Sequence, residues 1–239
     1  MSAGADLFLD KLVAGYGKVR IVGGVDLEAR AGRITCVFGP NGSGKSTLLK
    51  AIVGLAPVWG GRVRYGERRL DGQPVSEAIR SGLSVVSQGS NVFPLLTVRE
   101  NLRMGAYILR ARGEFEQRLD EVLSLFPALK DKLRAKGSEL SGGQRMLLSV
   151  AQALMTRPEF VLLDEPSAGL SPVAALEVFR VLETLREQAK GILLVEQNVR
   201  EALRIADHVY VLVQGQTVFD GAAADVPDAK SLVRVYMQA

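Results

Sequence analysis

The sequence contains very little cysteine and histidine. Of its 239 residues, one is a cysteine, Cys36, and one is a histidine, His208. A single cysteine excludes an internal disulfide bond and fits a reducing compartment. We expect His208 to be structural, because it belongs to none of the spacing motifs that mark metal or catalytic sites.

Long apolar runs and a strong net charge are also missing. No run reaches about 18 apolar residues, the length that spans a bilayer. Asp6 and Asp10 interrupt the first residues where a signal peptide would need an apolar core. The net charge is only +4 and no basic run is concentrated, so nucleic acid is not the expected partner.

Short apolar runs are present and alternate with helical stretches. This alternation is typical of a mostly parallel sheet covered by helices on both faces. The predicted buried strands are residues 34–38, 83–86, 160–163, 192–195 and 209–213. The last run continues through Gly215 as a hairpin, and a helical pattern over 48–55 ends near Gly54.

Residues 95–155 show no convincing strand. Within this region, one run places its apolar residues on a single helix face and ends at Pro127. Those apolar residues are Phe115, Leu119, Val122, Leu123 and Phe126. The pattern predicts a helical lobe inserted into the sheet domain.

Gly39 to Ser46 match the phosphate-loop pattern G-x-x-x-x-G-K-[ST] in full, between a predicted strand and a predicted helix. Glycines let backbone N–H groups turn toward phosphate oxygens, and the helix N-terminus adds partial positive charge. Lys45 is expected to neutralise the β- and γ-phosphates, and the Ser46 hydroxyl to ligate Mg²⁺. The complete motif disfavours the alternative of a glycine-rich turn that only opens a helix. The residues expected to contact nucleotide here are Gly39, Pro40, Asn41, Gly42, Ser43, Gly44, Lys45, Ser46 and Thr47.

A second motif, FVLLDEP, covers residues 160–166. The predicted strand delivers Asp164 and Glu165 to its carboxyl end, where ligands bind in open α/β sheets. Asp164 is suited to hold Mg²⁺, and Glu165 to orient or deprotonate an attacking water. Alone, the motif would fit a solvated acidic turn, but the phosphate loop favours the catalytic interpretation.

A third motif, LSGGQ, covers residues 140–144 and opens an apolar-faced helix. With GPNGSGKST before it and FVLLDEP after it, the whole chain resembles the ATP-binding cassette (ABC) ATPases. The resemblance implies a P-loop α/β fold with an antiparallel N-terminal β subdomain. It also implies one domain over 1–239, with a nucleotide-binding core at about 1–92 and 156–239 and a helical subdomain at about 93–155.

The resemblance gives roles to further residues. Tyr16 matches the aromatic residue that stacks on adenine, although it could also be a half-buried strand tyrosine. Gln88 matches the glutamine that contacts Mg²⁺ and water, although it could also be an ordinary loop residue. LSGGQ implies a second anion site at a helix start, which faces the nucleotide of another cassette across a dimer. Its residues are Leu140, Ser141, Gly142, Gly143 and Gln144.

A narrower resemblance comes from VFPLLTVRENLRMGAY, DEPSAGLSP and LLVEQN, which are similar to the LivF-type subunit of branched-chain amino-acid importers. Urea and short-chain amide importers have very similar subunits. Gln197 stands where the broader family has histidine, and Ser171 where it has an acid. We interpret Gln197 as a neutral γ-phosphate sensor, and Glu196 and Asn198 as solvated residues at the strand end.

This resemblance implies ATP and Mg²⁺ as cofactors and a position on the cytoplasmic face of the inner membrane. The implied partners are two membrane permease subunits and a second cassette, either a LivG-type paralogue or another copy of this chain. A periplasmic solute-binding protein would take part indirectly. Residues 92–98, VFPLLTV, are a candidate permease contact or part of the packing inside the helical lobe.

Two other classes of protein remain as alternatives. A soluble cassette protein acting on ribosomes or DNA would carry two cassettes or long coiled-coil insertions, and neither is seen. A nucleotide-gated binding module with little hydrolysis is suggested by Gln197. The presence of Glu165 argues against that module, because the catalytic carboxylate is in place.

Overall fold

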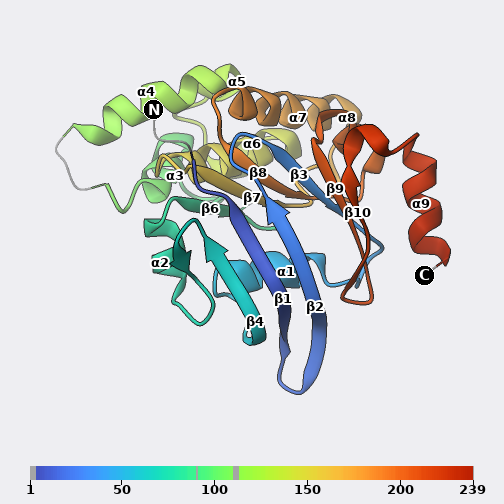
Figure 1. Cartoon of the computed structure of the whole chain (residues 1–239). Coiled ribbons are helices and arrows are strands. Elements are labelled where there is room, and N and C mark those ends of the chain that lie inside the picture. The colour runs from blue at the N-terminus through green and yellow to red at the C-terminus, as the bar shows by residue number, and fades with distance from the viewer. Residues whose placement is uncertain (1–3, 90, 110–112, 239) are drawn as a thin grey trace.

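The computed structural model describes residues 4–89, 91–109 and 113–238 of the chain (Figure 1). These residues form two β-sheets with helices around them. The first sheet is antiparallel and has the order β2 (Val19–Ala29), β1 (Leu7–Tyr16), β4 (Val58–Tyr65) and β5 (Arg68–Arg69). The second has the order β10 (Gln216–Ala222), β9 (His208–Val213), β3 (Ile34–Phe38), β8 (Gly191–Val195), β7 (Phe160–Asp164) and β6 (Leu83–Val86).

In the second sheet, the strands from β9 to β6 run parallel, and β10 pairs antiparallel with β9. The α/β fold class, with its mostly parallel core sheet, is therefore confirmed. The five buried strands expected from the apolar runs are all present, with bounds that differ by at most one residue. The expected hairpin turns at Gln214 and Gly215, where φ is 48° and 77°.

The helices lie on both faces of the six-stranded sheet (Figure 1). They are α1 (Lys45–Ile52), α2 (Val75–Arg80), α3 (Val98–Gly105), α4 (Glu114–Leu125), α5 (Pro127–Lys130), α6 (Gly142–Leu154), α7 (Pro172–Glu187), α8 (Val199–Ile205) and α9 (Ala229–Gln238). Short 3₁₀ turns occur at η1 (Gly137–Glu139) and η2 (Ala223–Asp225). The α1 helix lies between the two sheets, and α7 and α8 cover the opposite face of the larger one.

The central strand β3 shows how one strand serves two cores. Successive side chains of a strand point to opposite faces. Cys36 packs toward α8, where its Sγ lies 3.8 Å from the Ala202 carbonyl oxygen. Val37 belongs instead to the core that contains Leu48 of α1. The apolar runs thus place α1, and the loop before it, at the carboxyl end of a buried strand.

The region between β6 and β7 is helical, as the sequence indicates. Helix α4 buries Leu119, Val122 and Leu123, and Pro127 then begins α5. Helix α6 packs against β6 and α7, so the start of α6 has a defined position beside the sheet.

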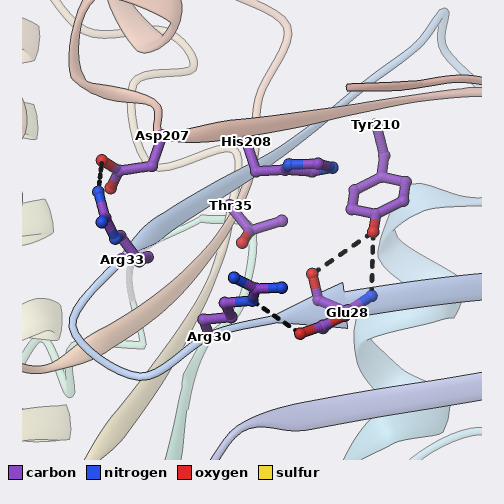
Figure 2. A pocket seen from close by; sticks show the side chains of 7 residues that line it. All are labelled: Glu28, Arg30, Arg33, Thr35, Asp207, His208 and Tyr210. Carbon is purple, nitrogen blue, oxygen red and sulfur yellow. Dashed lines mark hydrogen bonds and ion pairs between the residues drawn. The ribbon is translucent and has the colours of Figure 1, made fainter. Parts of the chain in front are cut away.

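Polar contacts join the two sheets at the amino-terminal ends of the parallel strands. Figure 2 shows the Tyr210 hydroxyl of β9 against the backbone of Glu28 in β2, whose N–H donates to it at 3.0 Å. Asp207 accepts hydrogen bonds from the Ile34 N–H at 2.8 Å and from Arg33 at 3.0 Å. The pocket drawn in Figure 2 thus combines one contact between the two sheets, Tyr210 with Glu28, and contacts of Asp207 within the larger sheet, on the side away from the phosphate loop.

Candidate nucleotide-binding site

The phosphate loop joins β3 to α1 and leaves the helix start without a side-chain cap. Gly44 occupies the N-cap with φ of 101°, a left-handed conformation that glycine adopts without steric cost. A Cβ on Gly44 would lie 3.0 Å from the Ile21 carbonyl oxygen. The first N–H groups of α1 thus form an open site for an anion.

Ser43 adds an unused donor to this loop. Its hydroxyl is buried and has no hydrogen-bond partner within the described part of the chain. A Cβ on Gly39 would approach it to 2.7 Å and the Leu212 carbonyl oxygen to 2.1 Å, so glycine is required there. Buried hydroxyl groups are normally paired, and a phosphate oxygen would supply the missing acceptor. The loop therefore fits a polyphosphate.

Lys45 is the first residue of α1, and its side chain is only 4% exposed. The ammonium group donates to the carbonyl oxygens of Gly39 at 2.9 Å and Pro40 at 3.1 Å. It also lies 3.5 Å from Oε1 of Glu165. The cation is thus held by its own loop and by the carboxylate across the pocket.

Ser46 and Asp164 meet across the loop and the end of β7. The Ser46 hydroxyl donates to Oδ1 of Asp164 at 2.9 Å. Burial raises the pKa of Asp164 above its ordinary value; the Ser46 hydrogen bond opposes this shift, and the Glu165 carboxylate adds to it. One hydroxyl and one carboxylate, with phosphates and water completing the set, fit Mg²⁺ as it is bound with nucleotides.

Glu165 has an unusual backbone. Its φ is 48°, in the left-handed region that non-glycine residues seldom occupy, and such conformations cluster at functional sites. Its N–H donates to the Val195 carbonyl oxygen of β8 at 2.9 Å. The Gln88 side-chain amide donates to Oε2 at 3.0 Å. The backbone and the carboxylate of Glu165 are therefore each held by a hydrogen bond, and the residue is only 6% exposed.

Lys45, Ser46, Gln88 and Glu165 line one pocket of about 520 Å³. The exposed Gln197, which follows β8, completes its wall. The pocket brings together these residues expected from the sequence: Asn41, Gly42, Gly44, Lys45, Ser46, Thr47, Gln88, Glu165 and Gln197. Ile21 and Ala168 also line it and were not expected, because neither belongs to a motif with phosphate chemistry.

The other expected residues do not line this pocket: Gly39, Pro40 and Ser43 of the phosphate loop, Asp164 at the end of β7, Tyr16, and the five LSGGQ residues. Tyr16 ends β1 with 41% of its surface exposed, and Ile21 of β2 lies nearer to the phosphate loop. LSGGQ lies at the start of α6, where the Ser141 hydroxyl accepts the Gln144 N–H at 3.2 Å. The Gln144 side chain accepts the Ser141 N–H at 3.1 Å in return. This capping box fixes the helix start while Ser141 and Gly142 remain exposed.

The interpretation of Glu196 and Asn198 as solvated residues is wrong. Glu196 is 1% exposed, and its carboxylate accepts N–H groups from Ser167, Gln197 and Asn198. Asn198 is half-buried and caps α8. Neither role is visible in the sequence, because a short strand ending in polar residues is ordinarily solvated.

Comparisons with known proteins agree with this geometry. The family model described as ABC transporter matches residues 22–168. The high-affinity branched-chain amino acid transport ATP-binding protein BraG of Pseudomonas aeruginosa is 39% identical over 91% of this chain and 93% of its own length. The probable branched-chain amino acid transport ATP-binding protein LivF of Archaeoglobus fulgidus is 41% identical over 95% of this chain and 96% of its own.

The fold has a solved counterpart in the ADP conformation of an ATP-binding cassette of an ABC transporter. That structure is 28% identical, has a TM-score of 0.87, and covers 98% of this chain and 99% of its own. No helix in the described residues is both long and apolar enough to cross a membrane. The chain belongs to the ABC transporter family and is an ATP-binding, ATP-hydrolysing cassette.

Proposed function

We propose that this chain is the ATPase subunit of an importer of branched-chain or related amino acids. The observation that carries the proposal is its likeness, over nearly the whole chain, to two ATP-binding proteins named for branched-chain amino acid transport. In this role the chain works on the cytoplasmic face of the membrane. It supplies ATP hydrolysis to two separate permease subunits, which a periplasmic solute-binding protein loads.

In the proposed site, the phosphate loop holds the triphosphate through the N–H groups at the start of α1 and the Ser43 hydroxyl. Lys45 turns from its own loop carbonyls to the β- and γ-phosphates. Ser46 and Asp164 would hold Mg²⁺, which would supply positive charge against the phosphates. Tyr16 stacks on adenine from the end of β1.

Glu165 is the proposed base. In the structure, Oε2 of Glu165 accepts the Gln88 amide and Oε1 faces Lys45. When Lys45 moves to the phosphates, Oε1 becomes free to accept a proton from water, while Gln88 keeps the carboxylate oriented. Gln197, on the other wall, donates its side-chain amide to the γ-phosphate without adding charge.

The exposed start of α6 is proposed to bind nucleotide held by a second chain. Ser141 and Gly142 do not line the pocket that contains Lys45. We therefore propose that LSGGQ contacts nucleotide bound to a partner cassette, either a LivG-type paralogue or a second copy of this chain. Each nucleotide would then lie between one phosphate loop and one α6 start.

A hollow beside β6 and α3 is the proposed permease contact. Residues 92–98 could contact a permease or pack inside the helical lobe, and the structure shows both environments. Val98 is fully buried, whereas Phe93 and Leu95 are exposed. Phe93 lines the hollow together with Met104 and Tyr107. Tyr107 is 72% exposed, so an apolar surface is open to a partner.

The experiment is co-expression with candidate permease subunits and reconstitution of the purified complex in proteoliposomes. We expect ATP-dependent uptake of leucine, and no uptake of urea. Met104→Glu should prevent co-purification while leaving ATP binding by the isolated chain intact. Val218→Glu is the matched control, because β10 lies at the opposite edge of the sheet from β6. Uptake of urea but not leucine would contradict the proposed amino-acid substrate and identify the transporter as a urea importer.

A further inference from the structure

Glu196 is a buried carboxylate that the proposed chemistry does not use. It follows β8 and is 1% exposed. Its Oε1 accepts the Ser167 N–H at 2.8 Å. Its Oε2 accepts the N–H groups of Gln197 at 3.0 Å and Asn198 at 3.1 Å. One side chain thus binds two backbone segments that lie 29 residues apart in the sequence.

These two segments carry the proposed base, Glu165, and the proposed γ-phosphate sensor, Gln197. Ser167 is two residues beyond Glu165, whose own N–H bonds to Val195 of β8. Gln197 is the residue directly after Glu196. The Glu196 carboxylate therefore links the loop that follows Glu165 to the backbone of Gln197. It does so beside the left-handed Glu165 backbone, which the surrounding structure must hold in place.

A buried carboxylate is a poor choice for stability alone. Removing an ion from water costs several kcal/mol, and apolar residues of similar volume often stabilise a protein as well or better. Burial raises the pKa of Glu196 above its ordinary value, against the opposing hydrogen bonds from Ser167, Gln197 and Asn198. What the carboxylate provides is two acceptor oxygens that face in two directions, which an apolar side chain lacks.

We infer that Glu196 is a positioning residue for ATP hydrolysis, whose two carboxylate oxygens fix the Glu165 loop and the Gln197 backbone relative to each other. The inference rests on the roles proposed for Glu165 and Gln197. Glu196 itself touches neither nucleotide nor water in this scheme. Its loss should therefore slow the chemical step and leave nucleotide binding nearly unchanged.

Glu196→Gln is the sharpest variant. Glutamine has the same length, but it has one acceptor oxygen and places an NH₂ group where the other oxygen stood. The glutamine oxygen can accept either the Ser167 N–H or the N–H groups of Gln197 and Asn198. On the other side, the glutamine NH₂ group would then face a backbone N–H group, and the two donors cannot bond. Glu187→Gln at the exposed end of α7 is the matched control, because the chemical change is identical there.

The measurements are kcat and KM for Mg-ATP in the transporter complex, with the melting temperature of each variant. We expect Glu196→Gln to lower kcat at least about tenfold, the scale of a displaced catalytic group, with KM changed less than about twofold. The control should match the parent. A parent-level kcat would overturn the inference, and so would a fall in kcat explained by a matching loss of folded protein.

A double-mutant cycle with Gln197 tests the positioning directly. If Glu196 acts through Gln197, Glu196→Gln should cost less in the Gln197→Ala background than in the parent. Fully multiplicative losses would contradict coupling through Gln197. If Glu196→Gln fails to fold, Glu196→Asp decides by the same criteria, because its shorter side chain cannot span both segments. Parent rates in Glu165→Gln and Gln197→Ala would instead refute the site roles, separately from Glu196.

Discussion

Lys45 and Glu165 form a buried ion pair across the phosphate-loop pocket. The ammonium nitrogen lies 3.5 Å from Oε1, and the two side chains are 4% and 8% exposed. The residue proposed to neutralise phosphate and the residue proposed to activate water are therefore in direct contact. We expect nucleotide binding to draw Lys45 away from Glu165, because one ammonium group cannot face the carboxylate and the γ-phosphate equally well.

Lys45→Ala should weaken ATP binding and also destabilise the empty chain. The variant removes the ammonium group that is proposed to bind the phosphates. It also leaves the Glu165 carboxylate buried without its cationic neighbour, with only the Gln88 hydrogen bond. Removing one partner of a buried pair is costly. We expect ATP affinity to fall at least about tenfold and the melting temperature to drop by about 6–20 °C. Calorimetry and thermal unfolding measure the two effects, with the exposed Lys18→Ala as control. Unchanged ATP affinity would contradict the role of Lys45.

Asp164→Asn should stabilise the empty chain at neutral pH while abolishing Mg²⁺-dependent hydrolysis. The pKa of Asp164 is raised in the folded chain, chiefly by burial. A carboxyl with a raised pKa stabilises the fold below its unfolded pKa, about 3.9, and loses that contribution as pH rises through the folded pKa. Asparagine keeps the acceptor for the Ser46 hydroxyl and carries no charge.

Thermal unfolding from pH 4 to pH 8 measures this difference. The melting temperature of Asp164→Asn should exceed that of the parent at pH 7.5, and the gap should narrow as pH falls. An Asp164→Asn chain that is less stable than the parent at pH 7.5 would show that the ionised carboxylate contributes to the fold.

Gln197→Ala should lower steady-state hydrolysis at least about tenfold, because it would remove the proposed hydrogen bond to the charged γ-phosphate, worth roughly 1.4 kcal/mol. Gln197→His should keep activity, since imidazole also offers an N–H donor of similar reach. The measurement is the ATPase rate at saturating Mg-ATP. Gln188→Ala, at the exposed end of α7, controls for loss of a surface glutamine. If Gln197→Ala kept the parent rate, this strand end would not take part in hydrolysis.

The α6 start can be tested without removing its cap. Ser141→Asn and Ser141→Asp both retain a side-chain acceptor for the Gln144 N–H, so the helix should begin normally in each. Only aspartate places a negative charge where the partner's γ-phosphate is proposed to lie. We expect Ser141→Asp to prevent ATP-driven association of the cassettes by light scattering, while Ser141→Asn associates. Loss of ATP binding by the isolated Ser141→Asp chain would mean that LSGGQ serves its own nucleotide.

The sequence allowed most of the core sheet to be predicted, because its buried strands are apolar runs between turn signals. It also allowed the phosphate loop to be predicted, since glycine, lysine and serine occur there at the spacing that phosphate binding needs. Local patterns could not reveal Glu196, because its partner Ser167 lies 29 residues away and meets it only when β7 and β8 pair. The position of Ile21 in the pocket could not be predicted for the same reason, because an ordinary strand residue reaches the pocket only through the packing of the two sheets.

The most direct test of the account is single-turnover hydrolysis by Glu165→Gln at saturating Mg-ATP, with ATP binding measured on the same sample. Glutamine keeps the length of the side chain but cannot take a proton from water. We expect ATP affinity close to that of the parent and a rate of phosphate release lower by roughly 10² to 10⁴. Release of phosphate by Glu165→Gln at the parent rate would contradict the claim that this carboxylate is the base for hydrolysis.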